Sequence, residues 1–191
     1  MPFIGNQPAK VPLTSADITD GIITSAKIAD GTIANTDIST TAAIATSKLG
    51  AGAVLQVVTA TDSTSRSTTS TSFVTASNTL SVSITPSSSS NKIFVIVSGN
   101  LYQQTAAKYT IATIYRGATD LGAASDKGLT NLWTYPNDSG ASLCMTILDS
   151  PATTSATTYQ VYFRTATSSG GTAYLNENAC KSSITAFEIA G

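Results

Sequence analysis

Between Leu13 and Leu49 an aliphatic residue recurs at every fifth position, with one slip of the frame. The positions concerned are Leu13, Ile18, Ile23, Ile28, Ile33, Ile38, Ile44 and Leu49. Two residues before nearly all of these positions the side chain is small, as at Ala16 and Gly21. The pairs Asp20-Gly21 and Asp30-Gly31 are turn formers, so we expect a bend about every ten residues. A spacing kept this regularly identifies the segment as a repeat.

A period of five suits neither a helix nor a strand. In an α-helix each step of five residues advances by about 500°, so the stripe drifts around the axis. In a strand an odd step sends alternate isoleucines to opposite faces. Two architectures therefore stay open. One is a single-chain quadrilateral β-helix, whose spacing is similar to that of the pentapeptide-repeat family. The other is a stalk in which several copies pool their isoleucines. We favour the stalk, because so few pentads give a single coil barely two turns.

From Val54 onward the apolar residues alternate with polar ones in short runs, which predicts strands with one buried face. The alternating sets are Leu80, Val82 and Ile84; Leu143, Met145 and Ile147; Tyr159, Val161 and Phe163; and Phe187 and Ile189. Residues 93–97 are continuously apolar, so we expect this strand to be covered on both faces, by the opposing sheet and by a neighbouring subunit. With about eight strands between turn-rich gaps, the pattern predicts an all-β, jelly-roll-like β-sandwich.

These patterns divide the chain into three parts. Residues 1–12 include Pro8 and Pro12, spaced for extended backbone, and the apolar pair Phe3 and Ile4. The segment is too short to fold alone, so we expect it to order only against a partner. Residues 13–50 form the repeat, and residues 51–191 form the β-sandwich.

Composition narrows the classes of function. The chain has 10 Lys plus Arg, 11 Asp plus Glu, no His and a net charge of −1. Nucleic-acid binding needs clustered basic residues, so no nucleic-acid partner is expected. The start of the chain lacks the pattern of an export signal, and no run approaches the roughly 20 apolar residues that span a bilayer, so we expect no membrane insertion. Of the two cysteines, Cys144 and Cys180, we favour burial as free thiols over a disulfide.

The same composition argues against catalysis. The absence of His removes the commonest general base and zinc ligand. The acidic residues are scattered, mostly in turns, and do not suggest the converging pair that a glycosidase needs. Calcium-loop spacing is absent too. We therefore expect no enzyme activity, no catalytic residue, no metal site and no cofactor.

One loop, residues 132–140, combines the only Trp with a Tyr and two short polar side chains. Trp133, Tyr135, Asn137 and Asp138 are the residues concerned. Two roles stay open for them. A large aromatic residue commonly fills the core or a subunit interface. Alternatively, the aromatic rings stack on the C–H face of a sugar while Asn137 and Asp138 bind its hydroxyls, which makes a host surface glycan the candidate ligand.

The opening MPFIGNQP, the Ile-x-Asp-Gly-x-Ile repeats, the Ser- and Thr-rich β-domain and the ending SITAFEIAG together resemble the small fibre proteins of tailed bacteriophages. The resemblance implies a homotrimer located on the virion. It implies that an N-terminal segment with Phe3, Ile4, Gly5 and Pro8 docks on other virion proteins. It also implies that the pentad isoleucines form a trimeric shaft and that the C-terminal knob attaches to the host.

Two other functions remain possible on this pattern. A capsid-decorating, cement or head-fibre protein would use the same trimeric knob to contact coat subunits. A non-enzymatic carbohydrate-binding module would act as a free secreted protein and would need an export signal. Our prediction is the trimeric tail fibre.

Overall fold

The computed structural model describes residues 14–39, 41–42, 44, 48–106, 108–122, 127–135, 137–166 and 171–191. The chain divides into two compact units, Met1–Ala45 and Thr46–Gly191. The first unit carries most of the repeat and the second is the β-sandwich. Each unit is described separately below.

The repeat unit is a succession of tight turns spaced by five residues. Three short 3-10 helices recur at ten-residue intervals, η1 (Ser15–Asp17), η2 (Ser25–Lys27) and η3 (Asn35–Asp37). Between them lie turns with Gly21 (φ +80°) and Gly31 (φ +79°) at the third position. Because a positive φ is strained for a residue with a Cβ, these two positions require glycine. A turn therefore closes every five residues, twice as often as the bend every ten residues that the Asp-Gly pairs predicted.

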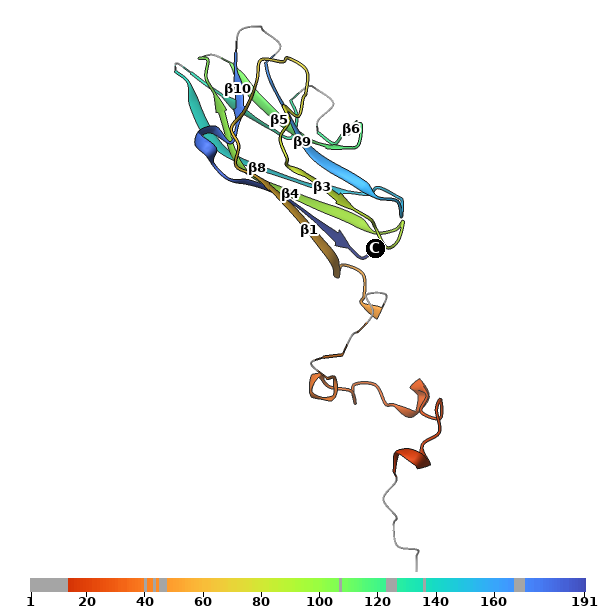
Figure 1. The fold of residues 1–191 in the computed structure, drawn as a ribbon. Helices are drawn as coiled ribbons and strands as arrows, with labels where there is room; N and C mark the ends of the chain where they lie inside the picture. Colours follow the sequence, from red (N-terminus) through yellow and green to blue (C-terminus); the bar gives the residue numbers. More distant parts are fainter. Residues whose placement is uncertain are drawn as a thin grey trace, which may run out of the picture. The chain divides into compact units, whose positions relative to one another are not determined.

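The second unit is an all-β sandwich of two antiparallel sheets, as predicted (Figure 1). Sheet A contains β1 (Val54–Asp62), β2 (Arg66–Thr68), β4 (Lys92–Gln103), β8 (Ser139–Asp149), β10 (Ala173–Leu175) and β11 (Ser182–Ile189). Sheet B contains β3 (Ser81–Ile84), β5 (Tyr109–Arg116), β6 (Thr119–Asp120), β7 (Thr130–Trp133) and β9 (Thr157–Thr165). The chain changes sheet at six of its ten strand-to-strand connections, which gives the jelly-roll-like character. A short 3-10 helix, η5 (Glu177–Ala179), precedes β11.

Strand β4 organises sheet A, because it pairs along its length with β8 on one side. On its other side it pairs first with β11 and then with β10. In sheet B, β5 lies between β9 and the two short strands β6 and β7. The described residues thus form eleven strands rather than about eight, because β2, β6 and β10 are too short to produce a periodic pattern.

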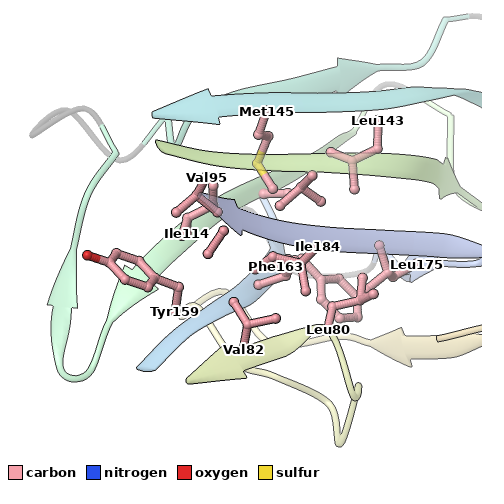
Figure 2. Close-up of a cluster of buried hydrophobic side chains, with 14 of the residues drawn as sticks. Leu80, Val82, Val95, Ile114, Leu143, Met145, Tyr159, Phe163, Leu175 and Ile184 are labelled. Carbon is pink, nitrogen blue, oxygen red and sulfur yellow. The ribbon is translucent and has the colours of Figure 1, made fainter. Parts of the chain in front are cut away.

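The core lies between the two sheets and includes most of the alternating residues that the sequence singled out (Figure 2). Sheet B supplies Leu80, Val82, Ile84, Ile114, Tyr159, Val161 and Phe163, and sheet A supplies Ile93, Val95, Val97, Leu143, Met145, Leu175 and Ile184. Burial of one such large side chain contributes about 1.5–3 kcal/mol, so this layer supplies most of the driving force for folding.

One expectation about burial is confirmed in part, and two others are wrong in whole or in part. Alternate members of residues 93–97 face the core as expected, while Phe94 and Ile96 point outward and are half-buried in the single chain. Cover of that outward face by a neighbouring subunit stays a prediction. Phe187 and Ile189 also lie on the outward face, since β11 buries Ile184, Ala186 and Glu188 instead. Cys144 and Cys180 are free as expected but exposed rather than buried.

The buried carboxylate of Glu188 explains the register of β11. This side chain is only 1% exposed. Its oxygens accept hydrogen bonds from Gln56 Nε2 (2.6 Å), Ser87 N (2.6 Å), Ser87 Oγ (2.8 Å) and Asn91 Nδ2 (2.6 Å). Burial alone would raise the pKa of Glu188, but these donors outweigh it and lower the pKa. The cluster ties β1 and the β3–β4 loop to the last strand.

Candidate interaction sites

Part of the predicted contact set lies outside the described residues. Phe3, Ile4, Gly5 and Pro8 of the docking segment fall there, and so does Leu13 of the repeat. The other seven pentad positions and all four residues of the Trp133 loop are described.

The pentad isoleucines occupy one recurring position in the turns of the repeat. Backbone N–H groups close turns onto carbonyl oxygens three residues earlier, from Asp17 to Thr14, Ile22 to Thr19, Lys27 to Thr24, Thr32 to Ala29, Asp37 to Ala34 and Ala42 to Ser39. Each turn takes four residues, and a single residue links it to the next. The linking residues are Ile18, Ile23, Ile28, Ile33 and Ile38. The period of five is therefore a four-residue turn plus one aliphatic link.

Polar side chains fix these turns locally. In the first turn, Asp17 Oδ2 accepts hydrogen bonds from both Thr14 Oγ1 (2.7 Å) and Thr14 N (2.8 Å). These bonds lower the pKa of Asp17 below its ordinary value. In the equivalent turn twenty residues later, Ala34 N donates to Asp37 Oδ2 at 2.8 Å. Asp17 and Asp37 thus serve the turns, as the sequence suggested for the acidic residues of the repeat.

The link positions are not buried by their own chain. Ile18, Ile23, Ile28, Ile33, Ile38, Ile44 and Leu49 are each between 39% and 55% exposed. A closed single-chain coil would bury these side chains at its centre, so the quadrilateral β-helix does not form within the described part of the repeat. Turns locked by local hydrogen bonds present a row of apolar side chains that no element described here covers.

The β-sandwich has an entry end and a free end. At the entry end, Gly52 N donates to the carbonyl oxygen of Ala190 (2.8 Å) and Ala190 N donates to that of Ala53 (2.9 Å). The start of β1 and the C-terminus therefore lie side by side (Figure 1). Strand β4 runs from there for twelve residues, roughly 36 Å at 3.3 Å per residue, to the opposite end. Described residues that follow β4 and β7 and precede β10 meet at that free end, since Thr134 Oγ1 donates to the carbonyl oxygen of Thr105 and Gln104 N donates to that of Thr172.

Trp133 lies at the free end and not in the core. It is 47% exposed and stands directly opposite Tyr109 on the outer face of sheet B. The two rings lie 4.3 Å apart between centroids at an angle of 43°, and Lys127 Nζ lies 5.3 Å from the centre of the Tyr109 ring. This arrangement is a half-exposed aromatic platform with one cation beside it. Such a platform can stack on a sugar ring or on another planar group.

Asp138 belongs to a second group on the outer face of sheet A. The hydroxyl of Tyr102 donates a short hydrogen bond to Asp138 Oδ2. This hydrogen bond raises the pKa of Tyr102 to about 12. The Tyr102 ring lies edge-to-face with Tyr174 at 5.7 Å, and the Tyr174 hydroxyl donates to Gln104 Oε1 at 3.0 Å. The group offers aromatic edges beside carboxylate and amide oxygens, which are the acceptors that sugar hydroxyls use.

Between the two groups runs the β7–β8 connection, which holds Tyr135, the most exposed aromatic residue in the described part of the chain. Tyr135 is 77% exposed, and Asn137 is exposed as well. The neighbouring Thr134 is buried, and its hydroxyl donates to the carbonyl oxygens of Thr105 (2.8 Å) and Lys108 (3.2 Å). Thr134 thereby anchors this connection to the β4–β5 loop. The four predicted residues thus share one end of the β-sandwich, with Trp133 and Asp138 in separate groups and Tyr135 and Asn137 on the connection between them.

Sequence reasoning missed Tyr109, Tyr102, Tyr174 and Lys127. Tyr109 is 24 positions from Trp133, and only the β5–β7 register brings the two together. The sequence did show that all seven tyrosines lie in the β-sandwich, but this did not indicate which of them lie beside Trp133 or Asp138.

Other acidic side chains serve the fold. Asp62 accepts from Thr64 N, Thr79 N and Arg66 Nε, and these contacts outweigh its burial and lower its pKa. Asp149 accepts from Arg116 Nη1 and from the hydroxyl of buried Tyr159. Among the described residues no group of three His, Cys, Asp or Glu is placed to hold a metal. A search of these residues found no helix with the length and apolarity to cross a membrane.

Comparison with known proteins gives weak matches. No protein-family model matches the chain, and no curated protein does. Among solved structures it is similar to the infectious bursal disease virus VP2 subviral particle, with 16% identity and a TM-score of 0.38 over 70% of this chain and 38% of that one. It is also similar to the structure of the Gx strain of infectious bursal disease virus, with 16% identity and a TM-score of 0.33 over 71% of this chain and 37% of that one. The chain spans under two fifths of either structure, and we infer its function from its own residues.

Proposed function

We propose that this protein is a homotrimeric bacteriophage tail fibre that attaches the virion to the host surface without enzymatic activity. In this proposal residues 1–12 dock on other virion proteins and the pentad isoleucines form the trimeric shaft. The free end of the β-sandwich then contacts a host surface glycan.

The observation that carries the proposal is the position of the isoleucines. Each sits at the link between two turns whose hydrogen bonds are already satisfied within the chain. The side chains are nevertheless about half exposed, and no described residue of the same chain covers them. Transfer of the exposed half of an isoleucine out of water contributes about 1 kcal/mol. A row repeated in three copies therefore favours association around a common axis.

The two ends of the β-sandwich differ, and this difference supports glycan binding at the free end. The chain enters beside its own C-terminus, and the aromatic groups of Trp133 and Tyr102 lie at the opposite end. A domain attached at its entry end presents the other end to solution. Aromatic residues with short polar neighbours suit a glycan, which offers C–H faces and hydroxyls.

Non-enzymatic binding follows from the chemistry of this end. Asp138 is engaged by Tyr102, and the nearest identified cation is Lys127 beside Tyr109. The chain has no His. The charged residues described at the free end are of both signs and include Asp138, Glu177, Lys108 and Lys127. We therefore expect binding to vary little with salt and the glycan to be released intact.

The test uses the full-length protein and a panel of bacterial surface polysaccharides. We expect a particle of three times the 19.5 kDa chain mass, binding of similar strength in low and high salt, and no new reducing ends. New reducing ends would overturn the non-enzymatic role. A trimer that binds no polysaccharide would favour the capsid-decorating, cement or head-fibre function, in which the same end contacts coat subunits. A monomer that binds would favour the free carbohydrate-binding module.

A further inference from the structure

The outer face of sheet A carries a continuous apolar row across four strands. Val57 on β1 stands opposite Phe187 on β11, Phe187 stands opposite Phe94 on β4, and Phe94 stands opposite Leu148 on β8. Val57 is 54% exposed and Leu148 is 53% exposed, while the two phenylalanine rings lie 6.3 Å apart and are half-buried. We call these four residues the sheet A row.

Other segments of the same chain pack over part of the outer face of sheet B. There Ile111 and Thr113 are buried, because the segments around Gly122 and Gly128 pack over them. Phe73 covers Tyr115 further along the same face, with ring centroids 6.2 Å apart. The chain's own segments thus cover part of the outer face of sheet B, whereas no described segment covers the sheet A row.

The spacing of the repeat continues into this open face. Ile44, Leu49 and Val54 are separated by five residues each, and Val54 is the first residue of β1. Val54 is exposed and stands opposite the outward Ile189, next to the sheet A row. The five-residue spacing of the repeat therefore reaches a residue of sheet A that lies beside the sheet A row.

The residues around the sheet A row carry little charge, so this face of one copy can approach the same face of another copy. The outward neighbours of the row are Thr59, Thr185, Ile96 and Thr146, all uncharged. Lys92 lies at the margin of the row, where it pairs with Ile189. Among the described outward positions of β11, β4 and β8 around the row, it is the one charged residue. Copies can therefore bring this face together without repulsion between like charges.

We propose that the sheet A row is the contact surface between β-sandwiches of the trimer, occupied by the same face of another copy of this chain. The inference rests on the proposed trimeric fibre and extends its subunit interface from the shaft to the knob.

The experiment measures thiol accessibility in the full-length protein. Cys144 and Cys180 are first replaced by Ser, and one new cysteine is then introduced, either Thr59→Cys beside Val57 or Ser83→Cys as the control on the outer face of sheet B. Both positions are exposed in the single chain. We expect maleimide to label Thr59→Cys at least tenfold more slowly than Ser83→Cys under native conditions, and at equal rates in denaturant. Addition of Leu148→Asp should restore fast labelling of Thr59→Cys while the mass stays that of a trimer.

The outcomes separate this inference from the proposed function. A trimer in which both cysteines react at the same rate overturns the sheet A contact and leaves the shaft in place. A monomer with both cysteines reactive overturns the sheet A contact and the trimeric fibre together.

Discussion

Gly52 and Ala190 are joined by a 2.8 Å backbone hydrogen bond, so the β-sandwich begins and ends at the same place. The chain enters the β-sandwich at this entry end, whereas Trp133 and Tyr102 lie at the opposite end. In the proposed function that opposite end binds the glycan. This polarity underlies the first two predictions.

Replacement Trp133→Ala should weaken glycan binding at least tenfold, because the stacking of a sugar ring depends on the face of the Trp133 ring. The fold should lose only about 1 kcal/mol, since the ring is half exposed and packs mainly on Tyr109. The control is Tyr162→Ala, which removes a ring that packs on Tyr115 in mid-sheet (4.1 Å between centroids). Binding should be measured by titration calorimetry. Equal binding by both variants would place recognition elsewhere.

The Tyr102 phenol should ionise near pH 12, because its hydrogen bond to Asp138 favours the protonated form. Replacement Asp138→Asn removes the negative acceptor and should bring the pKa back toward the ordinary value of 10.0. NMR titration of ring-labelled tyrosines, with Tyr102→Phe for assignment, measures this. An unchanged titration in Asp138→Asn would show that the two side chains are not paired in solution.

Replacement Glu188→Gln should lower the free energy of unfolding at neutral pH by about 1–3 kcal/mol, because the donors Gln56, Ser87 and Asn91 lose their charged acceptor at this buried position. Since the folded-state pKa of Glu188 is lowered, its contribution is complete above the ordinary value of 4.5 and is lost as the pH falls through the folded value. Wild-type stability should therefore fall below about pH 4.5 more steeply than that of the variant.

The control for this measurement is Glu177→Gln. Glu177 accepts one longer hydrogen bond, from Ser65 Oγ at 3.3 Å, and lies near the surface. Urea unfolding at neutral and acidic pH compares the two variants. If both changed stability by the same small amount, the carboxylate cluster would not stabilise the entry end.

Replacement Gly99→Ala should destabilise the β-sandwich by about 2 kcal/mol or more, because an added Cβ would lie 1.8 Å from Ser182 Oγ and 2.5 Å from Ser182 Cβ. Ser182 is buried and donates its hydroxyl to Asn176, so it has no room to move. Replacement Gly50→Ala meets no atom within 4 Å and serves as the control. Thermal unfolding should separate the two variants, and equal melting temperatures would contradict the packing described here.

The sequence predicted the sandwich and most of its core because alternation is a local signal. It failed at β11, where Phe187 and Ile189 looked like core and Glu188 looked like surface. The reason is physical: Gln56, Ser87 and Asn91, all distant in sequence, satisfy the buried carboxylate. For the same reason, the neighbours of Trp133 could not be predicted, since the β5–β7 register brings Tyr109 to it.

The repeat was recognisable from its spacing, but its conformation was not. Asp-Gly pairs marked every second turn, whereas the intervening turns lack glycine and close as 3-10 helices. The exposure of Ile23 and its equivalents is a consequence of that geometry.

The central claim, that isoleucines at the link positions hold three chains together, is tested most directly by sedimentation equilibrium of two matched double variants. One is Ile23→Asp with Ile33→Asp, at link positions. The other is Ile22→Asp with Thr32→Asp, which adds the same charge one residue earlier, inside the turns. The account predicts three times 19.5 kDa for the wild type and for the turn variant, and 19.5 kDa for the link variant. A wild-type monomer, or a link variant that remains a trimer, would contradict it.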